Sequence, residues 1–446
     1  MSKPQTATAK FLEGSIPKHV MTMTLSSTVG LIGIFMVDLL DMFYLSMLGQ
    51  EELAAAIGFA GLISFFNISF CIGMSITTGI VTARTLGQKK PDLARSLFST
   101  FHAIAIMLSI LIMVLIFPFL QWLLVQVGAK GPTLDFASSY LWIVVPTLPF
   151  LASTMCANSG LRSLGEAKLA MYATLSGSLV NAVLDPILIF GFDMGIEGAA
   201  WATVVARIVM MIVAIRLLVK THDFFVKVNL DLILKHSREF FSISIPAILT
   251  NLATPIGNAY IVSTVAIYGA SAVAGYAIVG RIVPIAFAIV FALSGSIGPI
   301  VGQNFGAKVY DRIEQTINFS YLLTAVYSIV MWGLLWLLSP LIVELFSATG
   351  DAEVLLSLFL QFTSVMFLFT GITFVSNAVF NNLGNPKYST VMNWSKATIG
   401  TIPFIYLGNQ YYGLEGILYG QAAGNFVFGV IAFVSIKIYV ARKKGV

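Results

Sequence analysis

The residues most able to do chemistry are three aspartates inside long apolar stretches: Asp38, Asp41 and Asp185. An aspartate near the centre of a lipid bilayer costs about 2.5 to 3.5 kcal/mol on membrane-insertion scales, so such residues are rare without a function. Typical functions are the binding and transfer of protons or other ions. These aspartates are therefore candidates for an ion-coupled process.

Two of the aspartates are predicted to lie at a similar depth. Asp41 precedes Gly49, near the end of its apolar stretch, by eight residues, or roughly 12 Å of α-helix. Asp185 precedes Gly191 by six residues, or roughly 9 Å. Asn181 lies one helical turn below Asp185, in a position to hydrogen-bond to it or to a bound water.

Asp38 lies three residues before Asp41 and shares its helix face. Carboxylates gathered in a low-dielectric medium cannot all ionise at low cost, because desolvation and mutual repulsion favour the neutral form. At least one of them is expected to load and release a proton near neutral pH. The alternative is that a neighbouring Ser, Thr or Asn satisfies each aspartate and that the aspartates only help the helices to pack.

The elements that must position these acids are predicted to be membrane-spanning helices. The chain has 446 residues, of which 58% are hydrophobic and only 10% are charged, and this composition excludes a water-soluble domain. Twelve apolar stretches have about the length that crosses a bilayer. The predicted spans are 18–47, 53–82, 97–126, 136–160, 169–191, 196–219, 240–268, 272–305, 316–346, 354–380, 390–407 and 415–438. The predicted fold class is an all-α polytopic membrane protein.

Basic residues indicate the orientation of the spans, because short cytoplasmic loops retain Lys and Arg. They gather at the two ends of the chain and in alternate loops, and among the outward loops only one has a basic residue, Lys130. Both termini are therefore predicted to be cytoplasmic, in an inner membrane. The net charge of +5 follows from this topology and requires no nucleic acid partner.

The chain contains an internal repeat. LGEAK at 164–168 matches LGNPK at 383–387, an offset of 219 residues, but the membrane-buried acids occur only in the first copy. The repeat predicts two pseudo-symmetric six-helix bundles around a central cleft, with the ion chemistry in the first. The expected divisions are an N-terminal bundle over 1–219, a cytoplasmic linker over 220–239 and a C-terminal bundle over 240–446.

Metal and cofactor sites are not predicted. Cys71 and Cys156 lie within apolar spans without metal-ligand spacing, and the four histidines form no cluster. An intramembrane aspartate enzyme is disfavoured because a Gly-x-Gly-Asp run is missing, and a passive channel because no filter-like loop repeats. The chain is therefore predicted not to be an enzyme and to need no cofactor.

The residues now described resemble those of the multidrug and toxic compound extrusion (MATE) family of cation antiporters, in its proton-coupled DinF-like branch. DMFYLSMLG at 41–49 is similar to the family's first-helix pattern, and NAVLDPILIFGFDMGIEGAAWATVVA at 181–206 is similar to its fifth and sixth helices. The resemblance implies two bundles that form a V-shaped cleft and open alternately to each side. It also implies roles for four residues: Asp41 and Asp185 as proton carriers, Asn181 as a hydrogen-bonding partner of Asp185, and Thr203 as a member of the same cluster.

The chain departs from the family's pattern at Asp38, an additional acid, so either Asp38 or Asp41 can be the titrating group. Relatives driven by sodium resemble one another in carrying acids on helices seven and ten, where this chain has Asn258 and Asn377. Those two residues and Arg281, about ten residues inside the eighth span, are candidates for lining a substrate cleft. Arg207, on the sixth span, is interpreted as structural.

The predicted function is proton-coupled export of amphipathic or cationic organic compounds. The predicted partners are these small molecules, protons or Na+, and the lipid bilayer, with the chain acting as a monomer. The alternatives are a sodium-coupled exporter of the same family and a flippase for lipid-linked precursors. The flippase is disfavoured because helices beyond the twelfth are missing.

Overall fold

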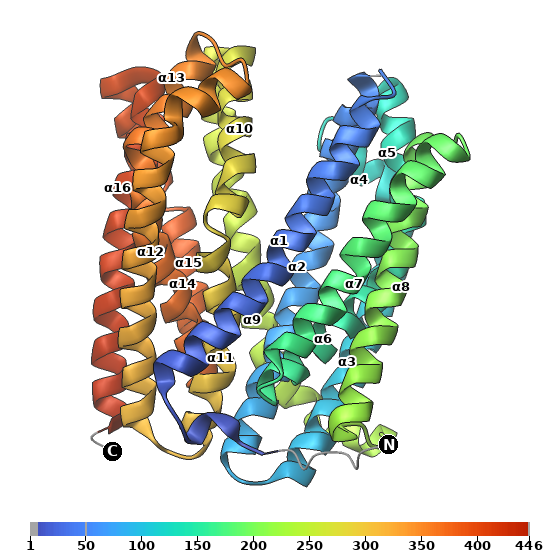
Figure 1. Cartoon of the computed structure of the whole chain (residues 1–446), viewed down its shortest axis with the longest axis vertical. Coiled ribbons are helices and arrows are strands. Elements are labelled where there is room, and N and C mark those ends of the chain that lie inside the picture. Colours follow the sequence, from blue (N-terminus) through green and yellow to red (C-terminus); the bar gives the residue numbers. More distant parts are fainter. Residues whose placement is uncertain (1–7, 50, 445–446) are drawn as a thin grey trace. The chain divides into compact units, whose positions relative to one another are not determined.

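The structure is a computed structural model that describes residues 8–49 and 51–444, and it is built from α-helices joined by short turns (Figure 1). Throughout these residues the backbone forms no β-strand. The prediction of an all-α polytopic membrane protein is confirmed.

The chain divides into two compact units. Val29–Ile248, together with the described residues up to Lys10, forms the first, and Phe11–Thr28 with the residues from Leu249 onward forms the second. Two helices contribute to both units: α1 (Ile16–Ser46) and α9 (Leu230–Val265). The other helices of the first unit are α2 (Glu51–Gly87), α3 (Pro91–Ile116), α4 (Leu120–Gln126), α5 (Gly131–Val144), α6 (Leu148–Ser163), α7 (Ala167–Pro186) and α8 (Gly195–His222). Those of the second are α10 (Ala270–Ala286), α11 (Ala288–Gly306), α12 (Tyr310–Leu345), α13 (Asp351–Gln361), α14 (Phe367–Asn382), α15 (Pro386–Ala397) and α16 (Ile402–Lys444).

This grouping assigns both shared helices differently from the boundaries expected at 1–219, 220–239 and 240–446. The segment that connects α8 to α9 is short, because α8 ends at His222 and α9 begins at Leu230. As a statement about independent domains, the expected division stays a prediction.

Eleven helical segments of the described chain are long and apolar enough to cross a membrane. The last, Pro386–Lys444, covers two of the predicted spans, because α16 reverses at Gly413, where a φ of 58° and a ψ of −136° interrupt the helix. When that segment is counted as two, the spans number twelve, as predicted.

Several predicted spans consist of two helices rather than one. The span predicted over 136–160 is interrupted by a 3₁₀ turn at Val145–Thr147, which contains Pro146. The span predicted over 272–305 is interrupted at Phe287, between α10 and α11. Apolarity does not reveal such breaks, because a broken helix is as apolar as a continuous one.

The internal repeat is visible in the backbone of the two units. Positive φ angles recur at matched positions 219 residues apart, including a lysine pair for which this conformation is unfavourable. The pairs include Lys89 and Lys308 (φ 59° and 61°), Gly131 and Gly350 (55° and 61°), and Gly165 and Gly384 (80° and 87°). The LG turns that revealed the repeat are retained because only glycine adopts this conformation without strain.

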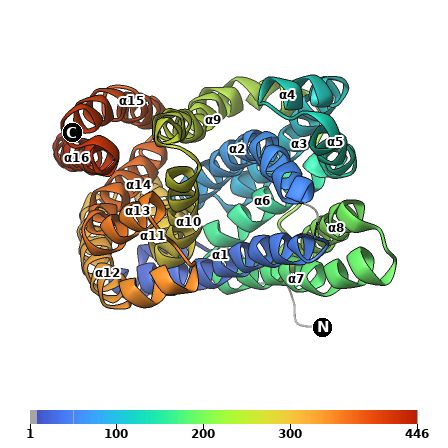
Figure 2. The same ribbon diagram turned by 90° about the horizontal axis from the view of Figure 1, so that it is seen from above.

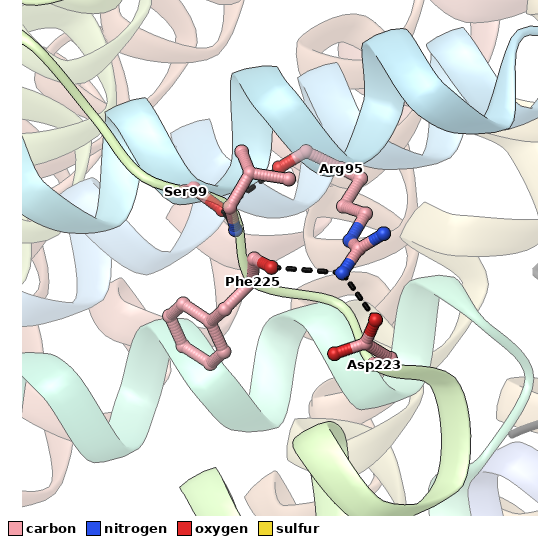
Figure 3. Close-up of polar contacts among 5 residues, drawn as sticks. Arg95, Ser99, Asp223 and Phe225 are labelled. Carbon is pink, nitrogen blue, oxygen red and sulfur yellow. Dashed lines mark hydrogen bonds and ion pairs between the residues drawn. The ribbon is translucent and has the colours of Figure 1, made fainter.

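The segment that leads into each shared helix is held by an arginine. In the first unit, Arg95 of α3 donates a hydrogen bond to the Phe225 carbonyl at 3.0 Å and pairs with Asp223. Ser99 accepts a hydrogen bond from the Val226 amide at 3.0 Å (Figure 3). These contacts provide hydrogen-bond partners for backbone groups of a segment that is not helical and therefore forms no regular hydrogen bonds of its own.

Arg312 of α12 has the corresponding role in the second unit. Its guanidinium donates to the Phe11 carbonyl at 2.9 Å and to the Gly14 carbonyl at 3.0 Å. The Phe11 amide donates to Gln303 at 2.8 Å, and the Phe11 side chain is buried. The segment that leads into α1 is thus held by contacts within the second unit, and the segment that leads into α9 by contacts within the first.

Helix packing in the first unit prepares a polar site. α2 packs against α3, α5 and α6, and α8 packs against α5, α6 and α7 (Figure 2). An apolar cluster that includes Leu45, Leu141 and Ile196 closes one end of this arrangement. The polar residues of α1, α5, α7 and α8 lie next to it.

Candidate functional site

Asp41 of α1 and Asp185 of α7 form the centre of the candidate site. Their carboxyl groups lie within hydrogen-bonding reach of each other, and Asp185 is fully buried. A hydrogen bond between two carboxyl groups requires a proton on one of them, because ionised carboxylates only accept. Each group also has one buried oxygen without a partner among the described residues, so the pair can take another proton or donor.

Small residues allow α1 to approach α7 closely enough to form this pair. A Cβ atom on Gly33 would lie 2.7 Å from the Leu175 side chain and 3.5 Å from the Ser178 hydroxyl. Asp41 follows Gly33 by two helical turns, and Asp185 follows Ser178 by the same number. The close approach below therefore brings the two carboxyl groups together above.

Asn181 and a helix break fix the position of Asp185. The Asn181 amide donates to a carboxyl oxygen of Asp185 at 3.3 Å, as predicted. Pro186 follows directly and ends α7, and a π-helical turn spans Ile187–Gly191. Proline has no N–H, and π-turns interrupt regular hydrogen bonding, so Asp185 lies at the point where the regular α-helix ends.

Tyr140 of α5 and Thr203 of α8 complete this level of the site. Electrostatic interactions connect the Tyr140 hydroxyl to Thr203 and to Asp41. Thr203 was anticipated in the sequence, whereas Tyr140 was missed. The only signal for Tyr140 was a polar aromatic residue within an apolar span, which is also typical of a membrane boundary.

Asp38 is exposed, in contrast to the buried Asp185. It interacts electrostatically with Asp41 and with Arg207 of α8. Sequence reasoning interpreted Arg207 as structural, but it lies one turn from Thr203 and on the same helix face. That spacing is the signal that could have connected Arg207 to the site.

Among the described residues, no interaction brings together the three that were predicted to line a substrate cleft. Arg281 and Asn258 are exposed, and Asn377 is buried with a side-chain oxygen that has no partner. Within the described part of the chain, no hydrogen bond or ion pair joins the three. Their role stays a prediction. The described residues also contain no group of three or more His, Cys, Asp or Glu side chains able to hold a metal ion.

A second cluster of charged side chains lies outside the spans. Glu166, in the turn before α7, contacts Lys10 and the His222 ring nitrogen Nε2, the latter at 3.4 Å. The hydrogen bond with His222 and the interaction with Lys10 lower the pKa of Glu166 from 4.5 to about 2. This cluster joins the N-terminal segment to α7 and α8.

Replacing Glu166 with glutamine is expected to destabilise the protein in a pH-dependent manner. A carboxyl whose pKa is lowered on folding stabilises the protein above its unfolded pKa, and the contribution is lost as the pH falls through the folded value. The difference in unfolding temperature between wild type and Glu166→Gln should therefore be full at pH 7 and shrink from about pH 4.5 toward 2.

Thermal unfolding of purified protein in detergent measures this difference. Glu415→Gln is the control, because Glu415 is exposed and has no ion-pair partner in the described chain. A difference that stays constant down to about pH 3 would show that the Glu166 charge contributes nothing.

The chain is similar to known proteins in both sequence and fold. The family model MatE matches the chain twice, over residues 27–187 and 246–407, and the two matches begin 219 residues apart. The chain is similar to a FAD transporter of Shewanella oneidensis (29% identity, 95% of this chain and 94% of that protein). It is also similar to the multidrug export protein MepA of Staphylococcus haemolyticus (27%, 95% and 93%).

Solved structures share the fold. A Vibrio cholerae MATE transporter, VcmN, superposes with a TM-score of 0.90 at 24% identity, covering 96% of this chain and 97% of that one. An outward-facing multidrug resistance transporter of the MATE family gives a TM-score of 0.91 at 21% identity and full coverage of both chains. At these identities the likeness concerns the fold alone.

Proposed function

Because the chain belongs to the MATE family of multidrug efflux transporters, we propose that it is a proton-coupled antiporter that exports amphipathic or cationic organic compounds by alternating access. The observation that carries this proposal is the close pairing of Asp41 and Asp185 within membrane-spanning helices. Two carboxyl groups so close cannot both ionise at low cost, so the pair is suited to hold one proton and to gain and lose a second.

The proposed cycle follows from charge. With one shared proton the pair carries a single negative charge, which attracts a cationic substrate. Uptake of a second proton neutralises the pair and removes that attraction, so the substrate is released. Proton and substrate then compete for two states of one element, and this competition is sufficient for exchange.

The orientation belongs to the same proposal. The concentration of Lys and Arg at the termini and in alternate loops supports cytoplasmic termini and insertion into an inner membrane. In that orientation Asp41 and Asp185 lie in the outer half of the membrane, where protons from outside reach them. We propose that a single chain performs the cycle.

Two further candidates remain open to test. Sodium coupling is disfavoured because the membrane-buried aspartates lie in the first repeat, but the carboxyl pair is also a set of oxygen ligands. An anionic cofactor is a second candidate substrate, because a relative covering nearly the whole chain is a FAD transporter. A lipid-linked precursor has no comparable support.

The decisive experiment uses purified protein in liposomes that contain a pH-sensitive dye. A lipophilic cation such as ethidium, added on one side, is expected to drive proton movement in the opposite direction. Substrate movement driven by a sodium gradient at constant pH would replace proton coupling with sodium coupling. Proton movement with FAD and not with ethidium would change the substrate class.

A further inference from the structure

A groove of about 90 Å³ lies in the second unit, between the start of α12 and the end of α16. These two ends lie side by side (Figure 1), because Lys444 of α16 pairs with Asp311 and Glu314 of α12. Seven residues before Lys444, the Lys437 ammonium donates a hydrogen bond to the side-chain oxygen of Asn318. Polar contacts therefore join the two helices at two levels, roughly 10 Å apart along α16.

The charged groups of this groove have unused hydrogen-bonding capacity. Lys437 has three N–H donors, and among the described residues Asn318 is its one acceptor and no carboxylate lies within 4.0 Å. On Glu314, one carboxylate oxygen contacts Lys444 at 3.4 Å, and the described residues offer no partner to the other. The groove thus offers a cation at one level and an anion at the next.

The floor of the groove is apolar. Ile317, Ile436 and Val440 line it, and each is at most 4% exposed. Contacts between charges are stronger beside such a low-dielectric surface than in open water. The volume is several times what a single water molecule needs, so the groove admits a small polar group.

An apolar surface continues from the groove along both helices. Leu322 and Val326 follow Asn318 on α12 at steps of four residues, on the same face, and are 59% and 53% exposed. The rings of Tyr321 and Phe433 lie 5.3 Å apart, so α12 and α16 remain neighbours at this level. Exposed apolar side chains on membrane-spanning helices contact acyl chains, so lipid tails have a surface that begins where the groove ends.

We propose that the groove between α12 and α16 binds one phospholipid with a primary-amine headgroup, phosphatidylethanolamine. Lys437 binds the phosphate, Glu314 accepts hydrogen bonds from the ammonium, and the acyl chains lie along Leu322 and Val326. This site is separate from the carboxyl pair of the first unit and does not depend on the proposed transport function.

The order of the charges along the helices favours this headgroup. Glu314 precedes Asn318 by one helical turn, roughly 5 Å, and lies nearer the end of α12. In a phospholipid anchored by its tails, the phosphate likewise lies deeper than the ammonium. Phosphatidylglycerol would instead bring an anionic headgroup beside the Glu314 carboxylate with no ammonium to offset the repulsion. Phosphatidylcholine has a quaternary ammonium, which has no N–H to donate.

Native mass spectrometry of the purified full chain in detergent tests the site, with dioleoyl phosphatidylethanolamine, phosphatidylglycerol and phosphatidylcholine added in equal amounts. Wild type is expected to retain phosphatidylethanolamine about fivefold over either other lipid, as a partly exposed ion pair allows. Lys437→Gln keeps a donor for Asn318 but loses the charge, and should lower phosphatidylethanolamine retention about fivefold. Glu314→Gln should remove the preference over phosphatidylglycerol.

Lys443→Gln is the matched control, because it removes a positive charge from the same end of α16 without lining the groove. It should leave the lipid pattern unchanged. Each preference is a ratio within one sample, so a variant of lowered stability still reports it. Equal retention of the three lipids by wild type would overturn the inference. So would an equal loss in Lys443→Gln and Lys437→Gln, or a preference for phosphatidylglycerol in wild type.

Discussion

Replacing Asp41 or Asp185 with asparagine will abolish proton-coupled export and leave the protein folded. Asparagine has nearly the shape of aspartate and can still hydrogen-bond across the pair, but it cannot gain or lose a proton near neutral pH. After either substitution only one titratable carboxyl group remains at the pair, whereas the proposed exchange uses two. The initial rate of substrate-driven proton movement should fall at least about tenfold, a change of about 1.4 kcal/mol in the barrier.

Two controls define this result. Asp231→Asn removes an exposed acid in the first turn of α9 and should transport at the wild-type rate. Size-exclusion profiles and unfolding temperatures establish that the variants at Asp41 and Asp185 are folded. A variant at either position that retains proton movement with an unchanged pH profile would exclude the pair as the coupling site.

Replacing Gly416 with alanine will strongly destabilise the second unit. A Cβ atom there would lie 1.9 Å from the Gly408 carbonyl oxygen, and one on Gly408 would lie 2.0 Å from the Gly416 carbonyl oxygen. The two arms of α16 thus pack backbone against backbone on either side of the turn at Gly413. Because neither backbone can yield locally, the arms must separate, at a cost of about 1 to 3 kcal/mol or more.

The matched control is Gly333→Ala in α12. Gly333 is also a helical glycine, but an added Cβ atom would meet no other atom within 4 Å. Alanine favours helix over glycine by about 1 kcal/mol, so this variant should unfold at or above the wild-type temperature. Equal unfolding temperatures for Gly416→Ala and wild type would show that the arms of α16 are not as closely packed as described.

Much of the fold was predictable because the lipid bilayer restricts the length and polarity of the segments that can span it. Each span must be apolar and about 20 residues long, since a shorter or polar segment leaves backbone groups unsatisfied in hydrocarbon. The repeat was predictable for a related reason. Gly165 and Gly384 adopt positive φ angles, and both copies kept the residue type that tolerates them.

The breaks within spans were not predictable. The 3₁₀ turn at Val145–Thr147 leaves the Val144 carbonyl to accept hydrogen bonds from the Thr147 hydroxyl at 2.6 Å and from Arg207, 63 residues away in sequence, at 3.3 Å. A sequence read locally contains the proline and the threonine but not the contact with Arg207. Likewise, the division of α1 and of α9 between the two units depends on packing that hydropathy does not describe.

The sequence by itself determined that the chain spans a membrane, that it is duplicated, and that Asp41 and Asp185 lie at similar depth on their helices. Only the tertiary structure decided that these helices are neighbours, that the two carboxyl groups lie close together, and that Arg207 bonds to Val144 and Thr147. The physical reason is that depth follows from one-dimensional spacing along a helix of fixed rise. Lateral adjacency depends on which helix faces fit together, here where Gly33 meets Leu175 and Ser178.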